Sequence, residues 1–531
     1  MHFLTTTIGC KVNQYETQAL AAALERHGGR RADPPGARTD LVVINTCCVT
    51  AAAAAKSRRA IRRAVKRHPS AHVLIFGCYA TQDGEALRRV GRDAGSTGRI
   101  HVAGHRDDIA ACVHHCAASL SGRAAAAEAS PCPAGEIPLR AEGTHQSSQT
   151  LVEPQPGGRG WRSGAASPAG PIGNDGWMRA GPSYFPVGLH PSTADTSTTI
   201  KPHRPAPVKA NVGTSALGPI RAFAGHQRAF VKVQDGCDAA CAYCVVPHLR
   251  GRPWWRPAND ILSEVEVLAA NGHREVVLCG VFLGAYGRDT TIRRRWAGPS
   301  ALPELLRRVA DVKGLWRVRL SSLHPGDVTD PLLKVFRDRP NVAPHLHLPL
   351  QSGSPSILRR MNRQYTPGEY LAAVASFRQA AESPAVTTDI MAGFPGESDE
   401  DFTQTIALAR AVGFSKIHVF PFSPRRGTAA WSWRREGPRA DTVKARCRQL
   451  AALERESAQA FRRQFLGRSV EVLVERPNSR TPPGHARGLT DRYVEVAFPG
   501  PGSAEDLIGQ IVPVQVTGLS ETGLRGTISR H

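Results

Sequence analysis

The sequence lacks any uninterrupted apolar run of about 18 or more residues, the length that a helix needs to cross a membrane. Residues 1–5 also lack the basic segment followed by an apolar one that marks a secretory signal. Because nothing indicates export, the 12 cysteines of this 531-residue chain are expected to bind metal or serve catalysis rather than form disulfides. We therefore expect a cytoplasmic protein with no membrane partner.

Acidic residues are scarce relative to basic ones, with 45 Asp and Glu against 68 Lys and Arg, a net charge of +23. This excess favours a polyanionic partner, and nucleic acid is the first candidate. The alternative is an Arg-rich composition caused by GC-rich DNA, which the frequent Ala, Gly and Pro also suggest. The length is sufficient for about three domains, and a hydrophobic content of 41% allows each to have a core.

Three cysteines, Cys237, Cys241 and Cys244, are spaced C-x₃-C-x₂-C directly after the strand-like run at residues 229–233. A loop this short can direct three sulfur atoms at one small object, and thiolates favour zinc or iron–sulfur clusters. Structural zinc and simple electron-transfer clusters normally have four protein ligands, and no fourth is obvious here. The open position indicates a metal group that takes part in chemistry. A zinc knuckle that lacks one ligand and unrelated buried thiols are the alternatives.

The first segment, to about residue 112, alternates strand-like and helix-like runs, as βαβ units of a parallel sheet do. Three strand-like runs each end just before a cysteine: residues 2–8 before Cys10, 41–44 before Cys47 and 72–76 before Cys78. In such sheets ligands bind beyond the carboxyl ends of the strands, so these thiols are expected to meet in one crevice as a second three-cysteine site. The alternative is that each is a small buried thiol. Cys48 is interpreted as a bystander.

Residues 117–226 are dominated by Ala, Gly, Pro, Ser and Thr and have no apolar periodicity. Because this composition cannot bury enough surface to offset its ordering entropy, we expect a disordered linker or insertion. Residues 227–435 then repeat strand and helix patterns six times, the rhythm of an α/β barrel with six strands instead of eight.

Polar or Gly-rich positions follow the strands of this barrel, where α/β barrels carry their sites. The candidate cofactor contacts are Gly280, Ser322, Gln351, Gly393, Pro395 and Gly396. For each, plain turn formation is the alternative. Beyond a helical stretch at 441–465, short alternating runs separated by Gly and Pro predict a small antiparallel β-barrel, a fold that often binds RNA. A structural cap is the alternative role of this barrel.

Together these features resemble the radical SAM methylthiotransferases, in which the C-x₃-C-x₂-C loop is the radical S-adenosylmethionine (SAM) signature. The resemblance covers nearly all of the chain except 117–226, a segment much longer than the usual connection of the family. Residues 9–13, 43–47 and 56–59 are most similar to the branch that acts on threonylcarbamoyladenosine in tRNA. Residues 348–354 and 393–397 are shared with sister branches, which act on isopentenyladenosine in tRNA or on an aspartate of a ribosomal protein.

The resemblance implies an α/β protein of four parts. These are a parallel, flavodoxin-like α/β domain at 1–116, the insertion at 117–226, a partial (β/α)₆ radical SAM barrel at 227–455 and a TRAM-like RNA-binding antiparallel β-barrel at 456–531. It also implies two [4Fe–4S] clusters. Cys237, Cys241 and Cys244 would hold the cluster that binds SAM, and Cys10, Cys47 and Cys78 would hold the auxiliary one.

The implied activity is addition of a methylthio group to C2 of N6-threonylcarbamoyladenosine beside the tRNA anticodon, with two SAM per turnover. The implied partners are the tRNA anticodon loop, an electron donor such as flavodoxin or ferredoxin, and a sulfur source. Arg250 and Trp254, which follow the cysteine loop, are expected to face the SAM site or the anticodon loop, or else to form a paired structural surface. The alternatives are the same chemistry on a sister acceptor and a non-catalytic iron–sulfur RNA-binding protein.

Overall fold

The computed structural model describes residues 1–32, 38–96, 98–105, 109, 111–113, 217–500 and 504–529, all within one compact unit. Most of the predicted insertion lies outside the described residues. Its last part, residues 217–226, is described, and Leu217, Ile220 and Phe223 are buried there in the same apolar core as the first helix. None of the helices that the structure describes is long and apolar enough to cross a membrane.

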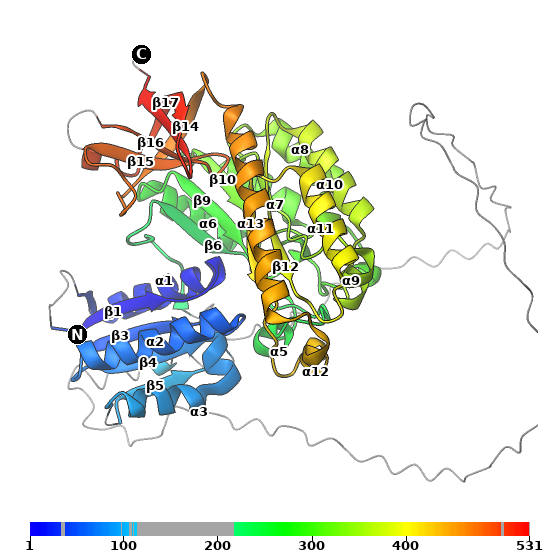
Figure 1. The fold of residues 1–531 in the computed structure, drawn as a ribbon. Coiled ribbons are helices and arrows are strands. Elements are labelled where there is room, and N and C mark those ends of the chain that lie inside the picture. Colours follow the sequence, from blue (N-terminus) through cyan, green and yellow to red (C-terminus); the bar gives the residue numbers. More distant parts are fainter. Residues whose placement is uncertain are drawn as a thin grey trace, which may run out of the picture. The chain divides into compact units, whose positions relative to one another are not determined.

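The N-terminal part is a parallel sheet with helices on both faces (Figure 1). Its strand order, β2-β1-β3-β4-β5, is the flavodoxin-like order, which confirms the predicted fold of this part. Alternate residues of β3 enter two different cores, Val43 on the α1 side and Val42 with Ile44 on the α2 and α3 side. The elements are β1 (His2–Thr7), α1 (Lys11–Arg26), β2 (Arg30–Arg31), β3 (Leu41–Thr46), α2 (Ala51–Arg67), β4 (His72–Gly77), α3 (Cys78–Asp93) and β5 (Ile100–Ala103).

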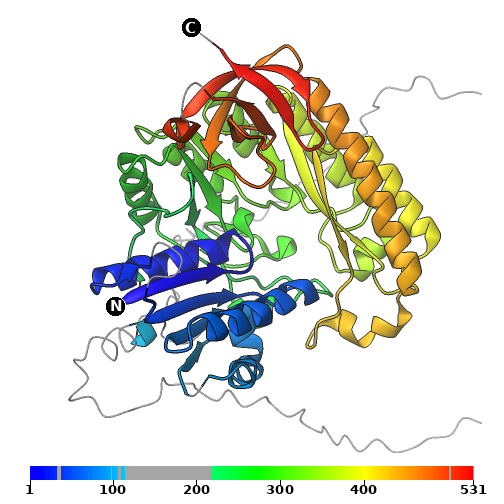
Figure 2. The same cartoon turned by 60° about the vertical axis from the view of Figure 1, so that its left-hand side comes forward.

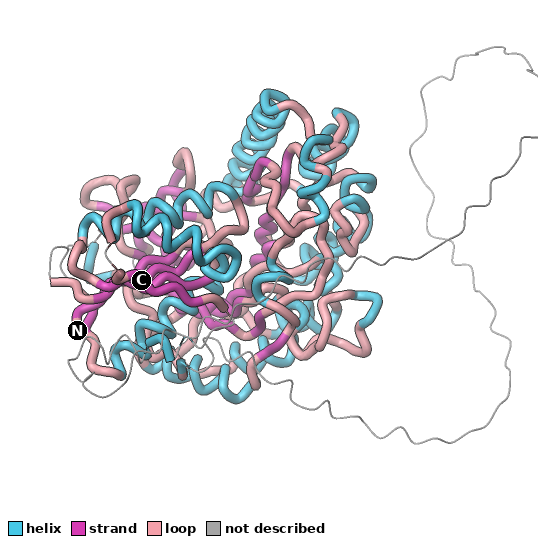
Figure 3. Tube along the Cα trace, turned by 90° about the horizontal axis from the view of Figure 1, so that it is seen from below, coloured by secondary structure: helices cyan, strands magenta, loops and turns pink. Residues whose placement is uncertain are grey.

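The central part contains the six predicted strands, β6, β9, β10, β11, β12 and β13, all in parallel pairings. Two sheets, β10-β9-β6 and β11-β12-β13, are joined by the parallel bridges Val318–Val342 and Ser322–His347. The result is a partial six-stranded barrel, as predicted, with helices outside the strands (Figure 3). The strands are β6 (Arg228–Lys232), β9 (Glu275–Cys279), β10 (Arg317–Leu320), β11 (His345–His347), β12 (Ala385–Ala392) and β13 (Lys416–Pro421).

Helices and short elements connect these strands. A two-stranded antiparallel pair, β7 with β8, flanks the cysteine loop. The connecting elements are β7 (Gln234–Asp235), α5 (Val246–Arg250), β8 (Trp254–Trp255), α6 (Ala258–Ala270), η2 (Leu283–Ala285), η3 (Arg293–Arg295), α7 (Leu302–Ala310), η4 (Pro325–Asp327), α8 (Asp330–Asp338), α9 (Pro355–Arg360), α10 (Pro367–Ala380), α11 (Asp399–Val412), α12 (Ala429–Ser432), η5 (Arg434–Glu436) and α13 (Ala440–Arg463).

The C-terminal part is a small closed barrel in the order β14-β15-β16-β18-β17. All neighbouring strands that pair are antiparallel except β16 and β18, which run parallel. Phe465, just past the end of α13, is buried in the core of this barrel, so the helix and the barrel share a junction. The elements are β14 (Ser469–Glu475), β15 (His485–Thr490), β16 (Glu495–Pro499), η6 (Ala504–Leu507), β17 (Ile511–Leu519) and β18 (Leu524–Ile528).

Candidate functional site

The three N-terminal cysteines lie at the carboxyl ends of three parallel strands. Cys10 is the N-cap residue of α1 after β1, Cys47 follows β3 directly, and Cys78 is the first residue of α3 after β4. Because β1, β3 and β4 are neighbours in the sheet, these strand ends share one edge. The sheet therefore brings Cys10, Cys47 and Cys78 to one side of the domain.

Amide side chains tie these strand ends together. Asn13 donates to Asn45 Oδ1 at 2.8 Å, Asn45 donates back to the Asn13 carbonyl at 2.9 Å, and Cys10 Sγ donates to Asn13 Oδ1 at 3.2 Å. Thr46 donates to the carbonyl of Phe76 at 2.7 Å and so fixes β3 to β4. The Asn-Thr-Cys sequence thus positions Cys47 through two side chains that precede it.

Burial keeps the thiols of Cys47 and Cys78 protonated. Burial raises the pKa of Cys78 to about 12, and the neighbouring Cys47 and Cys10 thiolates add to the increase, while Arg250 opposes it. Burial also raises the pKa of Cys47, with a further contribution from Cys10. These mutual effects show that the three sulfur atoms lie within electrostatic range of one another. Their deprotonation would have to be coupled to metal binding.

The loop with Cys237, Cys241 and Cys244 follows β6 and β7. Gly236 begins it with φ 74°, and a Cβ atom there would lie 2.0 Å from the carbonyl oxygen of Arg252, so only glycine fits. Cys237 Sγ lies 3.4 Å from both Thr291 Oγ1 and the backbone nitrogen of Ala239. Burial raises the pKa of Cys237 to about 11 and that of Cys244 to about 12.

An arginine approaches one sulfur atom of each cysteine group. Arg363 Nη1 is 3.3 Å from Cys241 Sγ, and Arg250 Nη2 is 3.7 Å from Cys78 Sγ. Guanidinium groups in this position stabilise thiolate charge, and hydrogen bonds to ligand sulfur are a known means of adjusting a cluster's potential. Sequence patterns did not point to Arg363, because it lies 122 residues from Cys241 along the chain.

A buried ionic network that includes Arg250 joins the N-terminal part to the central part. Arg250 Nη1 lies 2.9 Å from Glu16 Oε1 and 3.0 Å from Asp235, and Lys232 Nζ lies 3.3 Å and 3.1 Å from the same two carboxylates. Lys232 also stacks on Trp254, at 5.3 Å from the ring centre. The expectation that Arg250 faces the SAM site or RNA is therefore wrong, because the carboxylates of Glu16 and Asp235 hold this guanidinium in the interior. The alternative of a paired structural role holds.

The donor sets suit iron–sulfur clusters better than single ions. Among the described residues, no three His, Cys, Asp or Glu side chains stand close enough together to hold one metal ion. A single zinc ion would require all its ligands around one centre. In a cluster each thiolate binds a different iron atom, which requires a wider triangle. Three thiols with an arginine beside one of them fit such a group at each position.

The six candidate cofactor contacts all follow strand ends of the central barrel, and the structure gives most of them a local role. Gly280 packs against Gln234, and Ser322 forms a parallel backbone β-bridge with His347. Gln351 has φ 63° and forms a parallel backbone β-bridge with Ile390. In a second turn, the amide of Gly393 donates to Glu397 at 2.7 Å, Pro395 is buried, and the amide of Gly396 donates to the Glu436 carbonyl at 3.1 Å. Their contact with a cofactor stays a prediction.

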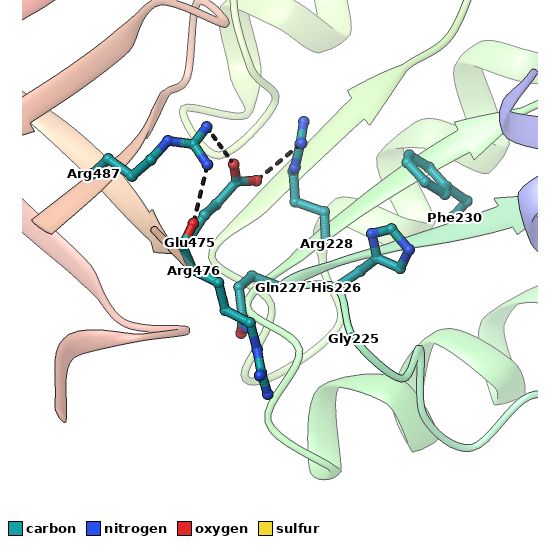
Figure 4. A pocket seen from close by; sticks show the side chains of 8 residues that line it. All are labelled: Gly225, His226, Gln227, Arg228, Phe230, Glu475, Arg476 and Arg487. Atoms are coloured by element: carbon teal, nitrogen blue, oxygen red, sulfur yellow. Dashed lines mark hydrogen bonds and ion pairs between the residues drawn. The ribbon is translucent and has the colours of Figure 1, made fainter. Parts of the chain in front are cut away.

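A pocket lies at the start of β6 (Figure 4). It is lined by Gly225, His226, Gln227, Arg228, Phe230, Glu475, Arg476 and Arg487. Glu475 pairs with Arg228 at 2.9 Å and with Arg487 at 3.3 Å. Because Arg228 is the first residue of β6 and the cysteine loop comes after its last, this pocket lies at the opposite strand end from the candidate site.

Comparison with known families divides the chain as the fold does. Residues 2–95 match the Uncharacterized protein family UPF0004, residues 231–409 match the Radical SAM superfamily, and residues 463–528 match the TRAM domain. Each of these matches falls on one of the three described parts of the fold.

Curated relatives match over the full length. The threonylcarbamoyladenosine tRNA methylthiotransferase MtaB of Chlamydia pneumoniae is 31% identical over 526 residues, covering 99% of this chain and 98% of the relative. A tRNA-2-methylthio-N(6)-dimethylallyladenosine synthase of Anaeromyxobacter dehalogenans is 32% identical over 532 residues, covering 98% and 93%. Among solved structures, the radical SAM methyltransferase TsrM of Kitasatospora setae is 16% identical to this chain, with a TM-score of 0.45. The match covers 80% of this chain and 76% of the TsrM chain. This likeness is too distant to support an argument.

Proposed function

Because the chain belongs to the radical SAM methylthiotransferase family, we propose that it adds a methylthio group to C2 of N6-threonylcarbamoyladenosine next to the anticodon of tRNA. Enzymes of this family use SAM and two [4Fe–4S] clusters. The observation that carries the proposed acceptor is the match to a threonylcarbamoyladenosine enzyme over 99% of this chain and 98% of that enzyme.

Each part of the chain has a place in this proposal. Cys237, Cys241 and Cys244 would hold the cluster that binds SAM, and Cys10, Cys47 and Cys78 would hold the auxiliary cluster. When bound, these groups supply the one-electron chemistry that an unactivated aromatic C–H bond requires. The protein itself would position these groups. Arg363 and Arg250 would each donate a hydrogen bond toward a ligand sulfur atom. The rim where SAM lies would be shaped by Gly280, Ser322, Gln351, Gly393, Pro395 and Gly396. A flavodoxin or ferredoxin would supply electrons.

The second candidate acceptor is dimethylallyladenosine in tRNA, which the names of several relatives specify. Two of them are 32% identical over 98% of this chain, and a third is 38% identical over 58% of it. One experiment separates the two. The anaerobically reconstituted enzyme is incubated with SAM, a reductant and tRNA carrying either nucleoside, and the digested nucleosides are analysed by mass spectrometry. We expect methylthiolation of threonylcarbamoyladenosine together with 5′-deoxyadenosine. Methylthiolation of dimethylallyladenosine alone would refute the proposed acceptor, and absence of 5′-deoxyadenosine would refute the enzyme itself.

Iron content tests the six proposed ligands. Wild type is compared with a triple Cys→Ala variant at Cys10, Cys47 and Cys78 and with another at Cys237, Cys241 and Cys244. We expect about eight irons per chain in wild type and about four in each variant. About four irons in wild type, unchanged by loss of the N-terminal cysteines, would remove the auxiliary cluster. Cys48→Ala is the matched control, because this buried thiol packs with Cys78, Val245 and Leu249 and is proposed to bind no iron.

A further inference from the structure

Helix α2 has a continuous basic face with no acidic residue to balance it. Its sequence from Ala51 to Arg67 contains no Asp or Glu. One side of the helix is buried on the sheet through Ala54, Ser57, Ile61, Ala64 and Val65. The exposed side carries the cations Lys56, Arg59, Arg62, Arg63, Lys66 and Arg67. None of these six takes part in an ion pair formed within the described part of the chain.

The like charges on this face lower the intrinsic stability of helix α2. Arg59 with Arg63 and Arg62 with Lys66 are like-charge pairs four residues apart, a spacing at which such side chains are neighbours and repel one another. Elsewhere the protein does pair its exposed helical arginines, as in α7, where Arg307 contacts Glu304 at 2.7 Å and Asp311 at 3.3 Å. The positive charges of this helix face are not neutralised within the described part of the chain, and such a face is suited to binding a polyanion.

The basic face starts at the candidate site. Ser57 donates to the Cys47 carbonyl at 3.0 Å and accepts from the Cys47 amide at 3.1 Å, and Arg58 donates to the hydroxyl of Tyr79, next to Cys78, at 2.8 Å. The amide of Ala51 donates to Ser423, on the rim of the central barrel, at 3.1 Å. The helix lies on the side of the sheet opposite α1 (Figure 2). Its cations therefore lead outward from the N-terminal cysteine group over about 16 Å, from Lys56 to Arg67.

We propose that this face of α2 binds the phosphate backbone of the anticodon arm of tRNA. The proposal rests on the tRNA acceptor of the proposed function. The reacting nucleotide must reach the cysteine sites, so the phosphates that α2 can reach are those closest to that nucleotide, in the same stem and loop. Flexible lysine and arginine side chains on a regular helix suit such sequence-independent contacts, which set register and orientation instead of reading bases.

The test neutralises four cations of the face in the full chain: Arg59→Gln, Arg62→Gln, Arg63→Gln and Lys66→Gln. Binding of a fluorescent anticodon stem-loop and of whole tRNA is measured by anisotropy over a series of salt concentrations. We expect the Kd to rise at least about tenfold at constant salt, and the slope of log Kd against log salt to fall by about 2 or more, since each lost phosphate contact removes about one. The thermal midpoint should stay level or rise, because repulsion within α2 is relieved.

A matched control removes the same charge elsewhere, with Lys313→Gln, Arg337→Gln, Arg448→Gln and Arg455→Gln at exposed positions of the central part. This variant should retain both affinity and salt slope. Equal weakening of the two variants would mean a general effect of net charge and would overturn the proposal. Unchanged tRNA binding by the α2 variant would also overturn it. If wild type binds no tRNA at all, the proposed function fails together with this inference, whereas a normal wild type beside an unaffected α2 variant refutes the inference alone.

Discussion

The guanidinium of Arg250 lies between the buried carboxylates of Glu16 and Asp235, where it decides their charge. Burial by itself raises the pKa of Glu16, but Arg250 and then Lys232 outweigh it and hold the pKa at about 2, against 4.5 in the unfolded chain. A pKa lowered by folding means that this carboxylate contributes stability above pH 4.5 and loses that contribution as the pH falls toward 2.

We predict that Arg250→Ala reverses this pH dependence. Without Arg250, only Lys232 remains to balance the two buried carboxylates of Glu16 and Asp235. Burial and the neighbouring Asp235 then dominate and the folded-state pKa of Glu16 rises above its unfolded value, so that the charged form opposes folding. At pH 8 the variant should be less stable than wild type by about 3–5 kcal/mol, the usual effect of removing one partner from a buried ionic network. The difference should shrink as the pH is lowered to about 5. Urea unfolding of the metal-free proteins at both pH values measures it.

Two variants make this result specific. Arg252→Ala removes an exposed arginine two residues away and should leave stability unchanged at both pH values. Arg250→Lys retains the charge but has no planar fork to reach Glu16, Asp235 and Asn13 at once, so it should restore only part of the loss. A deficit in Arg250→Ala that does not change between pH 8 and pH 5 would contradict the electrostatic explanation and indicate lost packing.

At the scale of elements, the junction of β4 and α3 depends on Gly77. Its φ is 98°, and a Cβ atom there would lie 2.2 Å from Asn45 Oδ1 and 2.6 Å from the Thr46 carbonyl oxygen. Gly77→Ala should therefore push away the Asn45 side chain that ties the ends of the strands together. We expect a loss of about 1–3 kcal/mol from the backbone conformation. Iron at the N-terminal site should also fall, measured in the Cys237, Cys241 and Cys244 triple variant, which retains only that site.

Gly95→Ala is the matched control for this prediction. Gly95 has nearly the same φ, 99°, but nothing lies within 4 Å of the position of its Cβ atom. Both substitutions should therefore lower the thermal midpoint, but only Gly77→Ala should lower the iron content. Equal iron in the two variants would mean that the strand ends do not need Asn45 in its present position.

The helices and strands could be predicted from the sequence because the residue patterns that specify them are local. Strand-like runs of Val, Ile and Leu ending at a cysteine gave β3 and β4, and repetition gave all six central strands. The contacts that complete the site are not local. Arg363 reaches Cys241 only after more than a hundred residues of intervening fold, and Arg250 contacts Glu16 across two parts of the chain. No spacing pattern in the sequence predicts contacts between residues so far apart in the chain, and so the sequence could not assign a partner to Arg250.

At the scale of the whole molecule, the small barrel and the cysteine loop lie at opposite ends of the central strands. Arg317 and Glu275, the first residues of β10 and β9, form a buried ion pair at 3.1 Å, and Arg319 donates to the Thr490 carbonyl of the small barrel at 2.5 Å. Candidate cofactor contacts follow the other ends of the same strands. A tRNA that contacts both the small barrel and the cysteine loop would have to extend over at least the length of a central strand, roughly 15 Å.

Tyr493 holds this junction together, and its removal tests how firmly the small barrel is attached. Its backbone is in the left-handed region with φ 57°, and its ring lies 3.9 Å from the Arg319 guanidinium carbon and 4.7 Å from the centre of the His345 ring. Tyr493→Asn tolerates that backbone but removes the ring, at a cost of about 1–3 kcal/mol. We expect hydrogen exchange about 10- to 100-fold faster in β14–β18 with unchanged protection in β9 and β12. Tyr493→Phe retains the ring and should match wild type. Equal acceleration in both barrels would instead mean that they unfold as one unit and that Tyr493 stabilises the whole molecule, not the attachment of the small barrel.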